Sequence, residues 1–459
     1  MKDLLSGSAL GAARAIRESK ISSRELTEAQ LERIEAINPK INALVEVHRE
    51  EALAAAEQAD RLLASGAELG ALHGVPISIK EAFQVKGFHS SWGNPVFKDA
   101  VLDRDATVVS RLRDAGAIVL GTSNVAFMLG DFGQSSNEVY GRTNNPWDLE
   151  RAPGGSSGGA AASVAAGLSF LDYGSDLAGS VRIPASFCGV YGLKPSVGIV
   201  PATGFQPPVP QALPSDHVYQ SAHGPIARSP QDLRAALALT AGPEAPTSKA
   251  YRWALPPSRH RELKEFRISV VLDHPAAPVS SEIGGLLSNA VDLLAAAGVS
   301  IHQGWPEGYD PERGAESFSF QLGMFFAFQG EPDDTSLAQL VEQENRRMAA
   351  RSQWQRHFEG CDVFLSPSNF TAAFPHDERS FGERTVWTPE GEQPYAAQPF
   401  WIAPASLTGL PALSAPIGRT ARGLPVGAQI VGPLYEDDTA ISFAELAAEV
   451  LGGFEAPPE

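Results

Sequence analysis

Hydrophobic and polar positions along this chain follow two different periods. In the first 70 residues the apolar positions recur about every 3.6 residues, as in ELTEAQLERIEAI, which is typical of amphipathic helices. Ser22 and Glu25 form a capping-box pattern at the start of that run, and the Asn-Pro pair at 38–39 predicts its end. A second helix is expected at about Glu46 to Ser65, so residues 1–70 should pack as helices.

From residue 71 onward the pattern changes to short apolar runs. VPISI and AIVLGTS are typical of buried strands, and amphipathic stretches such as TVVSRLRDAGA lie between such runs. The small-residue run at 158–167 predicts a helix that packs closely against the sheet. This alternation favours the α/β class, with a central mixed β-sheet covered by helices on both faces.

The same patterns continue to the end of the chain. They predict helices at 230–240, 281–298, 336–360 and 439–451, and strands at 267–272, at 361–370 and twice between 409 and 433. Residues 203–216 are Pro-rich and predict an ordered surface loop, whereas 303–395 has the least readable pattern. Because no repeat or linker interrupts the chain, we expect a single domain. Its parts are N-terminal helices (1–70), a catalytic core (71–200), a variable substrate-side region (201–395) and closing strands with a final helix (396–459).

Composition narrows the range of partners. The 459 residues carry a formal charge of −18, which repels phosphate backbones and anionic membranes, so we expect neither nucleic acid nor a membrane as partner. The two cysteines, Cys188 and Cys361, are far apart and no HExxH spacing occurs, so we expect no metal and no cofactor. The N-terminus lacks the apolar core of a signal peptide and no run of 18 apolar residues occurs, which favours the cytoplasm.

Chemistry is concentrated in a loop rich in glycine and serine. The segment RAPGGSSGGA, with Ser156 and Ser157, allows three interpretations. A phosphate-binding loop would need a lysine followed by serine or threonine, which is missing. A nucleophile elbow would need a preceding strand, but NNPWDLERAP is irregular and polar. The third interpretation is a plain loop before a helix.

Two further segments add reactive groups. In GSDLAGSVR, small residues precede Ser180, and successive backbone N–H groups before a serine can converge as an oxyanion hole. In GVPISIKEAF, Lys80 lies in an apolar run, and lysine is rarely buried without a partner. Serine needs a base to become a nucleophile, and a buried neutral lysine can be that base. No histidine occurs between His89 and His217.

Together these segments resemble the amidase signature family of serine hydrolases. The matching motifs are GVPISIK, the GGSSGG loop, GSDLAGSVRIPASFCGVYGLKPS and GLPVGAQIVGP, and the resemblance covers roughly residues 5 to 450. Lys80 precedes Ser156 by 76 residues, and Ser156 precedes Ser180 by 24, which is the family's spacing for its two serines. The resemblance implies the fold of that family and the hydrolysis of amide-type C–N bonds.

The resemblance also assigns roles to individual residues. Ser180 is expected to be the nucleophile, Ser156 the bridging serine beside a non-proline cis peptide bond, and Lys80 the base. The expected oxyanion-hole donors are the backbone N–H groups of Leu177, Ala178, Gly179 and Ser180. Supporting roles are expected for Ser157, Asp176 and Arg182.

Some positions depart from the family pattern, and these bear on the substrate. The family usually has Asp where this chain has Glu81, Thr or Ile and Gly where it has Leu177 and Ala178, and Asn where it has Ser406. By position, one wall of the substrate site should include Leu129, Gly130, Phe132 and Gln134. The aromatic residues of 318–328 are either a second wall or core. The apolar side chains predict a neutral, hydrophobic or aryl small-molecule substrate.

Three functions are compatible with these residues. The first is a stand-alone hydrolase of amides, anilides or carbamates. The second is the amidase component of a tRNA-dependent amidotransferase, although those proteins typically have Gln after the arginine, where this chain has Ile183. The third is a binding protein on an inactive amidase scaffold, which the presence of all three catalytic residues opposes. The resemblance also allows a homodimer.

Overall fold

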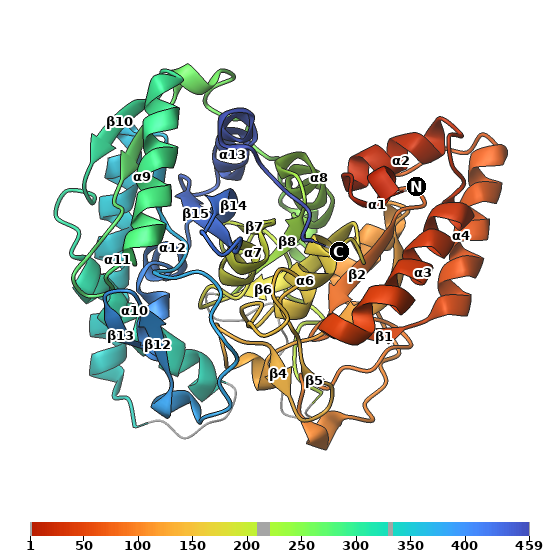
Figure 1. Cartoon of the computed structure of the whole chain (residues 1–459), viewed down its shortest axis with the longest axis horizontal. Helices are drawn as coiled ribbons and strands as arrows, with labels where there is room; N and C mark the ends of the chain where they lie inside the picture. The colour runs from red at the N-terminus through yellow and green to blue at the C-terminus, as the bar shows by residue number, and fades with distance from the viewer. Residues whose placement is uncertain (1, 209–220, 329–333, 459) are drawn as a thin grey trace.

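The structure is a computed structural model that describes residues 2–208, 221–328 and 334–458 (Figure 1). Within these residues the largest sheet has eight strands. Their order across the sheet is β10 (Ser300–Gln303), β9 (Arg267–Val270), β11 (Val363–Pro367), β15 (Pro425–Val431), β14 (Ala412–Arg419), β7 (Tyr191–Lys194), β8 (Ala222–Ala227) and β6 (Leu171–Asp176). Strand β9 is parallel to β10 and β11, and the other neighbouring pairs are antiparallel. The predicted mixed sheet is therefore confirmed.

A second, three-stranded sheet extends this arrangement on the N-terminal side. It contains β1 (Leu44–Val47), β3 (Ile118–Ser123) and β2 (Pro76–Lys80) in that order. Strand β2 runs beside β6, and the backbone N–H of Ser78 donates to Ser169 Oγ at 2.8 Å. The two sheets thus meet at the strand that ends in Lys80. Two short hairpins complete the strands, β4 (Ser136–Asn137) with β5 (Gly141–Arg142) and β12 (Thr385–Thr388) with β13 (Gly391–Pro394).

Helices cover both faces of the large sheet. They are α1 (Lys2–Leu5), α2 (Ala9–Arg17), α3 (Ser23–Ile41), α4 (Arg49–Ala64), α5 (Thr107–Asp114), α6 (Gly158–Ala165), α7 (Arg182–Cys188), α8 (Pro230–Thr240), α9 (Ser281–Ala296), α10 (Pro311–Phe328), α11 (Leu337–Gly360), α12 (Ala403–Thr408) and α13 (Asp437–Leu451). On β8, Ile226 packs with α6 and α7, whereas its neighbour Ala227 belongs to the hydrophobic cluster that contains α8, α9 and α13. Alternation along a strand places these two side chains on opposite faces.

The N-terminal helices, on the right in Figure 1, differ from the prediction at two points. The capping box at Ser22 and Glu25 is present, but α3 continues past Pro39 and ends at Asn42, which has a φ of 49°. Asn38 stabilises this end because its side-chain oxygen accepts from the two N–H groups after Asn42. The second helix starts at Arg49, not Glu46, because 44–47 pairs with β3 as a strand.

Most later elements agree with the prediction. The helices near 230, 281, 336 and 439, the strands near 267 and 361 and the two closing strands are all present. In the poorly readable region, the structure adds α10 and the β12–β13 hairpin, which the sequence did not predict. Most of the predicted Pro-rich loop lies outside the described residues, and the division of the chain into parts stays a prediction. None of the described helices is long and apolar enough to span a bilayer.

The start of α6 packs directly on the end of β3. A Cβ atom added to Gly159 would lie 2.6 Å from the carbonyl oxygens of both Ala43 and Asn124, which are backbone atoms with no freedom to move aside. Gly285, on the exposed side of α9, has no atom within 4 Å of the same position. Alanine at these two helical glycines should therefore have opposite effects on stability.

We predict that Gly159→Ala destabilises the protein by about 1–3 kcal/mol, because the added methyl forces the helix away from the sheet. Gly285→Ala should stabilise it by about 0.5–1 kcal/mol, because alanine loses less conformational freedom in a helix. Urea denaturation midpoints of the two variants and the wild type measure both effects. An unchanged midpoint in Gly159→Ala would show that the α6–β3 contact is loose.

Candidate active site

Lys80 lies at the end of β2 with its side chain completely buried. Its Nζ donates to Ser156 Oγ at 2.7 Å, Ser157 Oγ at 2.8 Å and Ser175 Oγ at 3.0 Å. Strand β2 carries the lysine, the loop before α6 carries Ser156 and Ser157, and β6 carries Ser175. The fold therefore brings together groups that are 76 to 95 residues apart in the sequence.

Burial changes the protonation of this lysine. Removal from water lowers the pKa of Lys80 to about 7, although the negative charges of Asp176, Asp172 and Glu81 act in the opposite direction. The three groups that bind Nζ directly are hydroxyls, which can either accept or donate a hydrogen bond. The site therefore accommodates the ammonium and the neutral amine, and near pH 7 both forms are populated.

The loop that carries Ser156 is held by the backbone of a neighbouring segment. The Gly155–Ser156 peptide bond is cis. The N–H of Gly155 donates to the Phe132 carbonyl oxygen at 2.9 Å, and Ser135 Oγ donates to the Ser156 carbonyl oxygen at 3.3 Å. A Cβ on Gly155 would lie 2.5 Å from the carbonyl oxygen of Asp131, so glycine is required at this position.

Ser180 lies in the turn between β6 and α7, and its backbone is tied to the same loop. Its carbonyl oxygen accepts from the N–H of Ser157 at 3.1 Å. The residue is 7% exposed. Within the described part of the chain Ser180 Oγ has no hydrogen-bond partner, so the Ser156 and Ser180 hydroxyls are not bonded to each other in this state. Hydrogen bonds of catalytic groups are often long before a substrate binds.

The turn before Ser180 presents several backbone donors. The N–H groups of Leu177, Ala178 and Ser180 find no acceptor among the residues that the structure describes. The N–H of Gly179, by contrast, donates to Asp176 Oδ1 at 3.0 Å. Three of the four predicted oxyanion-hole donors are therefore free, and the fourth is engaged in holding the turn.

Asp176 and Arg182 form a buried ion pair across this turn. The Arg182 guanidinium donates to the Asp176 carboxylate at 2.8 and 3.0 Å, and both side chains are fully buried. Burial raises the pKa of Asp176, but the charge and hydrogen bonds of Arg182, with the charge of Lys194 and the Val181 N–H, together outweigh it and hold that pKa below its usual value. The guanidinium also donates to Gln429 Oε1 at 2.6 Å and Ser406 Oγ at 2.7 Å. The departure at Ser406 thus supplies an acceptor to the arginine.

Glu81, the other charged departure, points to a different loop. Its carboxylate accepts from the backbone N–H groups of Ser91 and Trp92, the latter at 2.9 Å, and from the Tyr140 hydroxyl at 3.0 Å. Burial raises the pKa of Glu81 to about 7 in spite of these donors. Glu81 therefore anchors residues 91–92 and makes no hydrogen bond to its neighbour Lys80.

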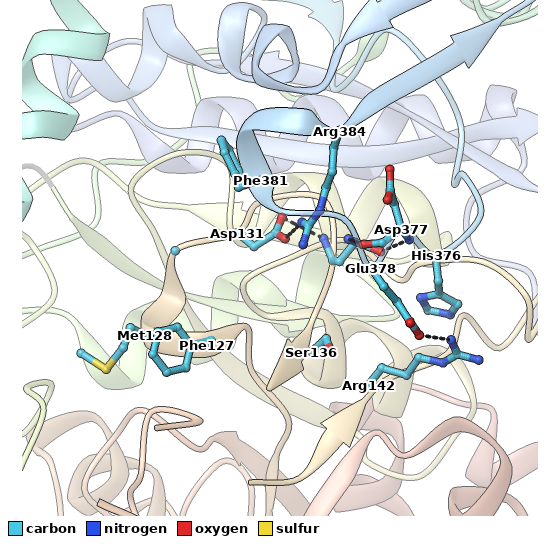
Figure 2. Close-up of a pocket in the computed structure, with 12 residues that line it drawn as sticks. Phe127, Met128, Asp131, Ser136, Arg142, His376, Asp377, Glu378, Phe381 and Arg384 are labelled. Carbon is cyan, nitrogen blue, oxygen red and sulfur yellow. Dashed lines mark hydrogen bonds and ion pairs between the residues drawn. The ribbon is translucent and has the colours of Figure 1, made fainter. Parts of the chain in front are cut away.

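Two cavities flank the 129–134 segment that was predicted to bind substrate. One of about 620 Å³ includes Gly130 and Gln134 among its lining residues (Figure 2). The Gln134 amide is engaged, because it donates to the Asp377 carbonyl oxygen at 3.0 Å and accepts from the Asp377 N–H at 2.8 Å. Phe132 lines the second cavity, of about 490 Å³, whereas Leu129 lines neither of the two.

Charges in the first cavity are paired with one another. Figure 2 shows Arg384 directed at Asp131, at 2.5 Å, and Glu378 directed at Arg142, at 3.6 Å. The second cavity is mainly apolar, and its lining includes Phe132, Phe318, Leu322, Phe381, Pro399 and Phe400. Of the aromatic helix 318–328, Phe318 is thus both buried and part of a cavity wall. In the described residues no three side chains of the metal-ligating types lie together.

Sequence reasoning missed two groups of this site. Ser175 binds Lys80 directly, and Asp172 lies buried on the same strand β6. The only signal for Ser175 was its place between two motif residues, Gly174 and Asp176. Asp172 interrupts the apolar run LSFLDYG as Lys80 interrupts its own, a signal that the sequence interpretation did not use.

Comparison with known proteins relates the whole chain to amidases. The family model described as Amidase matches residues 25–329 and 327–441. An acylamidase of Rhodococcus erythropolis is 33% identical over 92% of this chain and 91% of its own length. The A subunit of the glutamyl-tRNA(Gln) amidotransferase of Anaeromyxobacter dehalogenans (strain 2CP-C) is 33% identical over 96% of this chain and 95% of its own length.

Solved structures of amide-hydrolysing enzymes have a similar fold. The 6-aminohexanoate cyclic dimer hydrolase complexed with substrate is 27% identical, with a TM-score of 0.79 and coverage of 97% of both chains. A bacterial aryl acylamidase of the amidase signature family has the same fold, with a TM-score of 0.82 at 24% identity and coverage of 97% and 96%. The chain therefore belongs to the amidase signature family of hydrolases.

Proposed function

We propose that this protein hydrolyses an amide-type C–N bond of a neutral, hydrophobic or aryl small molecule through an acyl-enzyme on Ser180. The observation that carries the proposal is the hydrogen bond from the buried Lys80 Nζ to Ser156 Oγ, beside a free Ser180 hydroxyl. A lysine whose pKa is about 7 has the basicity that proton transfer at neutral pH requires. The amide, the anilide and the carbamate are the candidate substrates.

The proposed reaction uses the two serines as a proton relay. Neutral Lys80 takes the proton of Ser156, Ser156 takes the proton of Ser180, and Ser180 Oγ attacks the carbonyl carbon. The relayed proton returns through Ser156 to the leaving nitrogen, so the C–N bond breaks and the amine departs. Water then attacks the ester of Ser180 and releases the acid; with a carbamate, the released acid loses carbon dioxide.

The free backbone donors of the turn fit the charge that develops on the carbonyl oxygen. We assign the oxyanion hole to the N–H groups of Leu177, Ala178 and Ser180, with Gly179 oriented by Asp176. A donor of this type commonly contributes about 3–4 kcal/mol to transition-state stabilisation. Ser157, Asp176 and Arg182 are proposed to support this geometry, because their hydrogen bonds fix the turn and the lysine.

The cavities favour a substrate without net charge. The apolar cavity carries Glu312 and Glu316 on its α10 side, and neither has an ion-pair partner in the described parts of the chain. Their charges disfavour an anionic group there, while the aromatic lining favours an aryl or alkyl group. Gly130, Phe132 and Gln134 are proposed to shape the entrance to these cavities, together with Leu129.

The alternative function is that of one component of an amidotransferase, and overall sequence identity supports it as well as it supports the hydrolase. The acylamidase and the amidotransferase component are both 33% identical to this chain, so identity does not separate them. Ile183 and Pro184 after Arg182 favour the stand-alone hydrolase. Amide hydrolysis by the purified chain alone, with its size in solution measured alongside, distinguishes the two and tests the homodimer. Cytoplasmic location stays a prediction.

Replacing the relay residues should abolish hydrolysis. We predict that Ser180→Ala and Lys80→Ala each lower kcat/KM by roughly 10³-fold or more on the preferred member of a panel of a primary amide, an anilide, an aryl carbamate and an aryl ester. Ser288→Ala, an exposed serine on α9 that lines neither cavity, is the matched control and should retain activity. C–N cleavage that survives Ser180→Ala would exclude the acyl-enzyme.

Activity should rise with pH through about 7. Below that value Lys80 is protonated and cannot accept the serine proton, and above it the neutral amine predominates, so kcat/KM should reach a plateau. The pH profile of kcat/KM between about 5 and 9 measures this limb. The residual hydrolysis by Lys80→Ala should lack the limb; if it keeps the same pH dependence, another group is the base.

Substitution in the apolar cavity should change the substrate preference. Leu322→Ala removes apolar surface from the wall, so kcat/KM for the anilide should fall roughly 10-fold while that for a small aliphatic amide changes little. Leu337→Ala, on the exposed side of α11, is the control. Equal losses for both substrates in Leu322→Ala would place the aryl group elsewhere.

A further inference from the structure

Asp172 is a buried carboxyl group that the proposed relay does not use. It lies on β6 with no exposed surface, and one of its oxygens accepts a hydrogen bond from Ser78 Oγ. Ser78 precedes Lys80 by two residues on β2, so the two side chains point to the same face of that strand. The other oxygen, Oδ1, has no hydrogen-bond partner in the described residues.

The other charged groups around Lys80 are already engaged. Asp176 on β6 is paired with Arg182, and the Glu81 carboxylate accepts from Ser91, Trp92 and Tyr140. His223 on β8, opposite Ser175, is buried among aromatic rings, and burial lowers its pKa to about 4, so it is neutral near pH 7. Unlike Asp176, Asp172 has no bonded cation in the described residues; apart from Lys80 itself, the groups that act to lower its pKa are the Ser78 and Ser123 hydroxyls and the Tyr173 N–H.

The described structure has no direct ion pair between Asp172 and Lys80. The lysine's three bonds all go to hydroxyls, and the hydrogen-bond donor to Asp172 is again a hydroxyl. A carboxylate that is not hydrogen-bonded to the lysine still attracts its positive charge. Unlike a directly bonded carboxylate, it does not fix the proton in place. Burial raises the pKa of Asp172 to about 7, the same range as Lys80, so the two groups titrate as a coupled pair.

We propose that Asp172 is a positioning residue whose carboxylate, when ionised, stabilises the ammonium form of Lys80 and thereby sets the lowest pH at which the lysine is neutral and can accept the serine proton. The inference rests on the proposed function of Lys80 as the base. The inference predicts the direction of a pKa change. Removing the carboxylate charge removes an interaction that favours the ammonium, so the pKa of Lys80 should fall and the neutral amine should persist to lower pH.

The test is Asp172→Asn, which keeps an oxygen for the Ser78 hydrogen bond and removes the charge. The acid limb of kcat/KM should move to lower pH by about one unit. Ser78→Ala removes the donor that favours ionised Asp172, so it should move the limb in the same direction by a smaller amount. This variant tests the inference if Asp172→Asn does not fold. Asp437→Asn is the control, because that buried carboxylate on α13 accepts from Ser196 and faces Lys194.

A second readout separates this inference from the proposed function. The side-chain NMR signal of Lys80 reports its ionisation in the full-length protein whether or not the protein is active. A lower midpoint in Asp172→Asn, with no change in Asp437→Asn, supports the inference even if no panel substrate is cleaved. An unmoved midpoint and limb in Asp172→Asn and Ser78→Ala would overturn it and leave Asp172 a structural residue.

Discussion

The site depends on burying a lysine without a directly bonded counter-ion in the described residues. An ammonium group in an apolar interior is costly unless it is paired, and the usual solution is a carboxylate at hydrogen-bond distance. Lys80 instead meets three serine hydroxyls, and each of these can bond to either protonation state. The packing of β2 against β6 and the glycine loop serve this one arrangement, because a wider gap would admit water and restore the lysine's usual pKa.

Arg182, at the start of α7, is a second buried cation, and its guanidinium is bonded directly to the Asp176 carboxylate. Its further bonds to Gln429 and Ser406 join the turn before Ser180 to β15 and α12. One buried cation thus fixes the backbone that presents the oxyanion donors, while the other is left able to lose its proton. The difference lies in the side chain, because a guanidinium stays protonated in proteins whereas burial lowers the pKa of the Lys80 amine to about 7.

The sequence predicted the parts of this arrangement that short segments encode. Lys80 drew attention because a charge interrupted an apolar run, and the spacing of Ser156 and Ser180 carried the family resemblance; their roles stay predictions. Long-range pairings were not predictable. Residues 44–47 became a strand only because β3 lies beside them, and the Gln134 amide is taken up by a backbone 243 residues away. Asp172 matters only because β2 and β6 are neighbours.

Specificity within the family must arise outside the shared core. The acylamidase and the amidotransferase component are equally identical to this chain, although their names describe different activities. Under the proposed mechanism the lysine–serine group contacts only the bond that reacts, so it cannot by itself select among substrates. Most of the apolar cavity wall comes from α10 and residues 381–403, with Phe132 and Ala276 added from elsewhere, and part of this lining falls in 303–395, where the sequence pattern was least readable. Under the proposed function, this lining and the charges of Glu312 and Glu316 are where the substrate preference would be encoded.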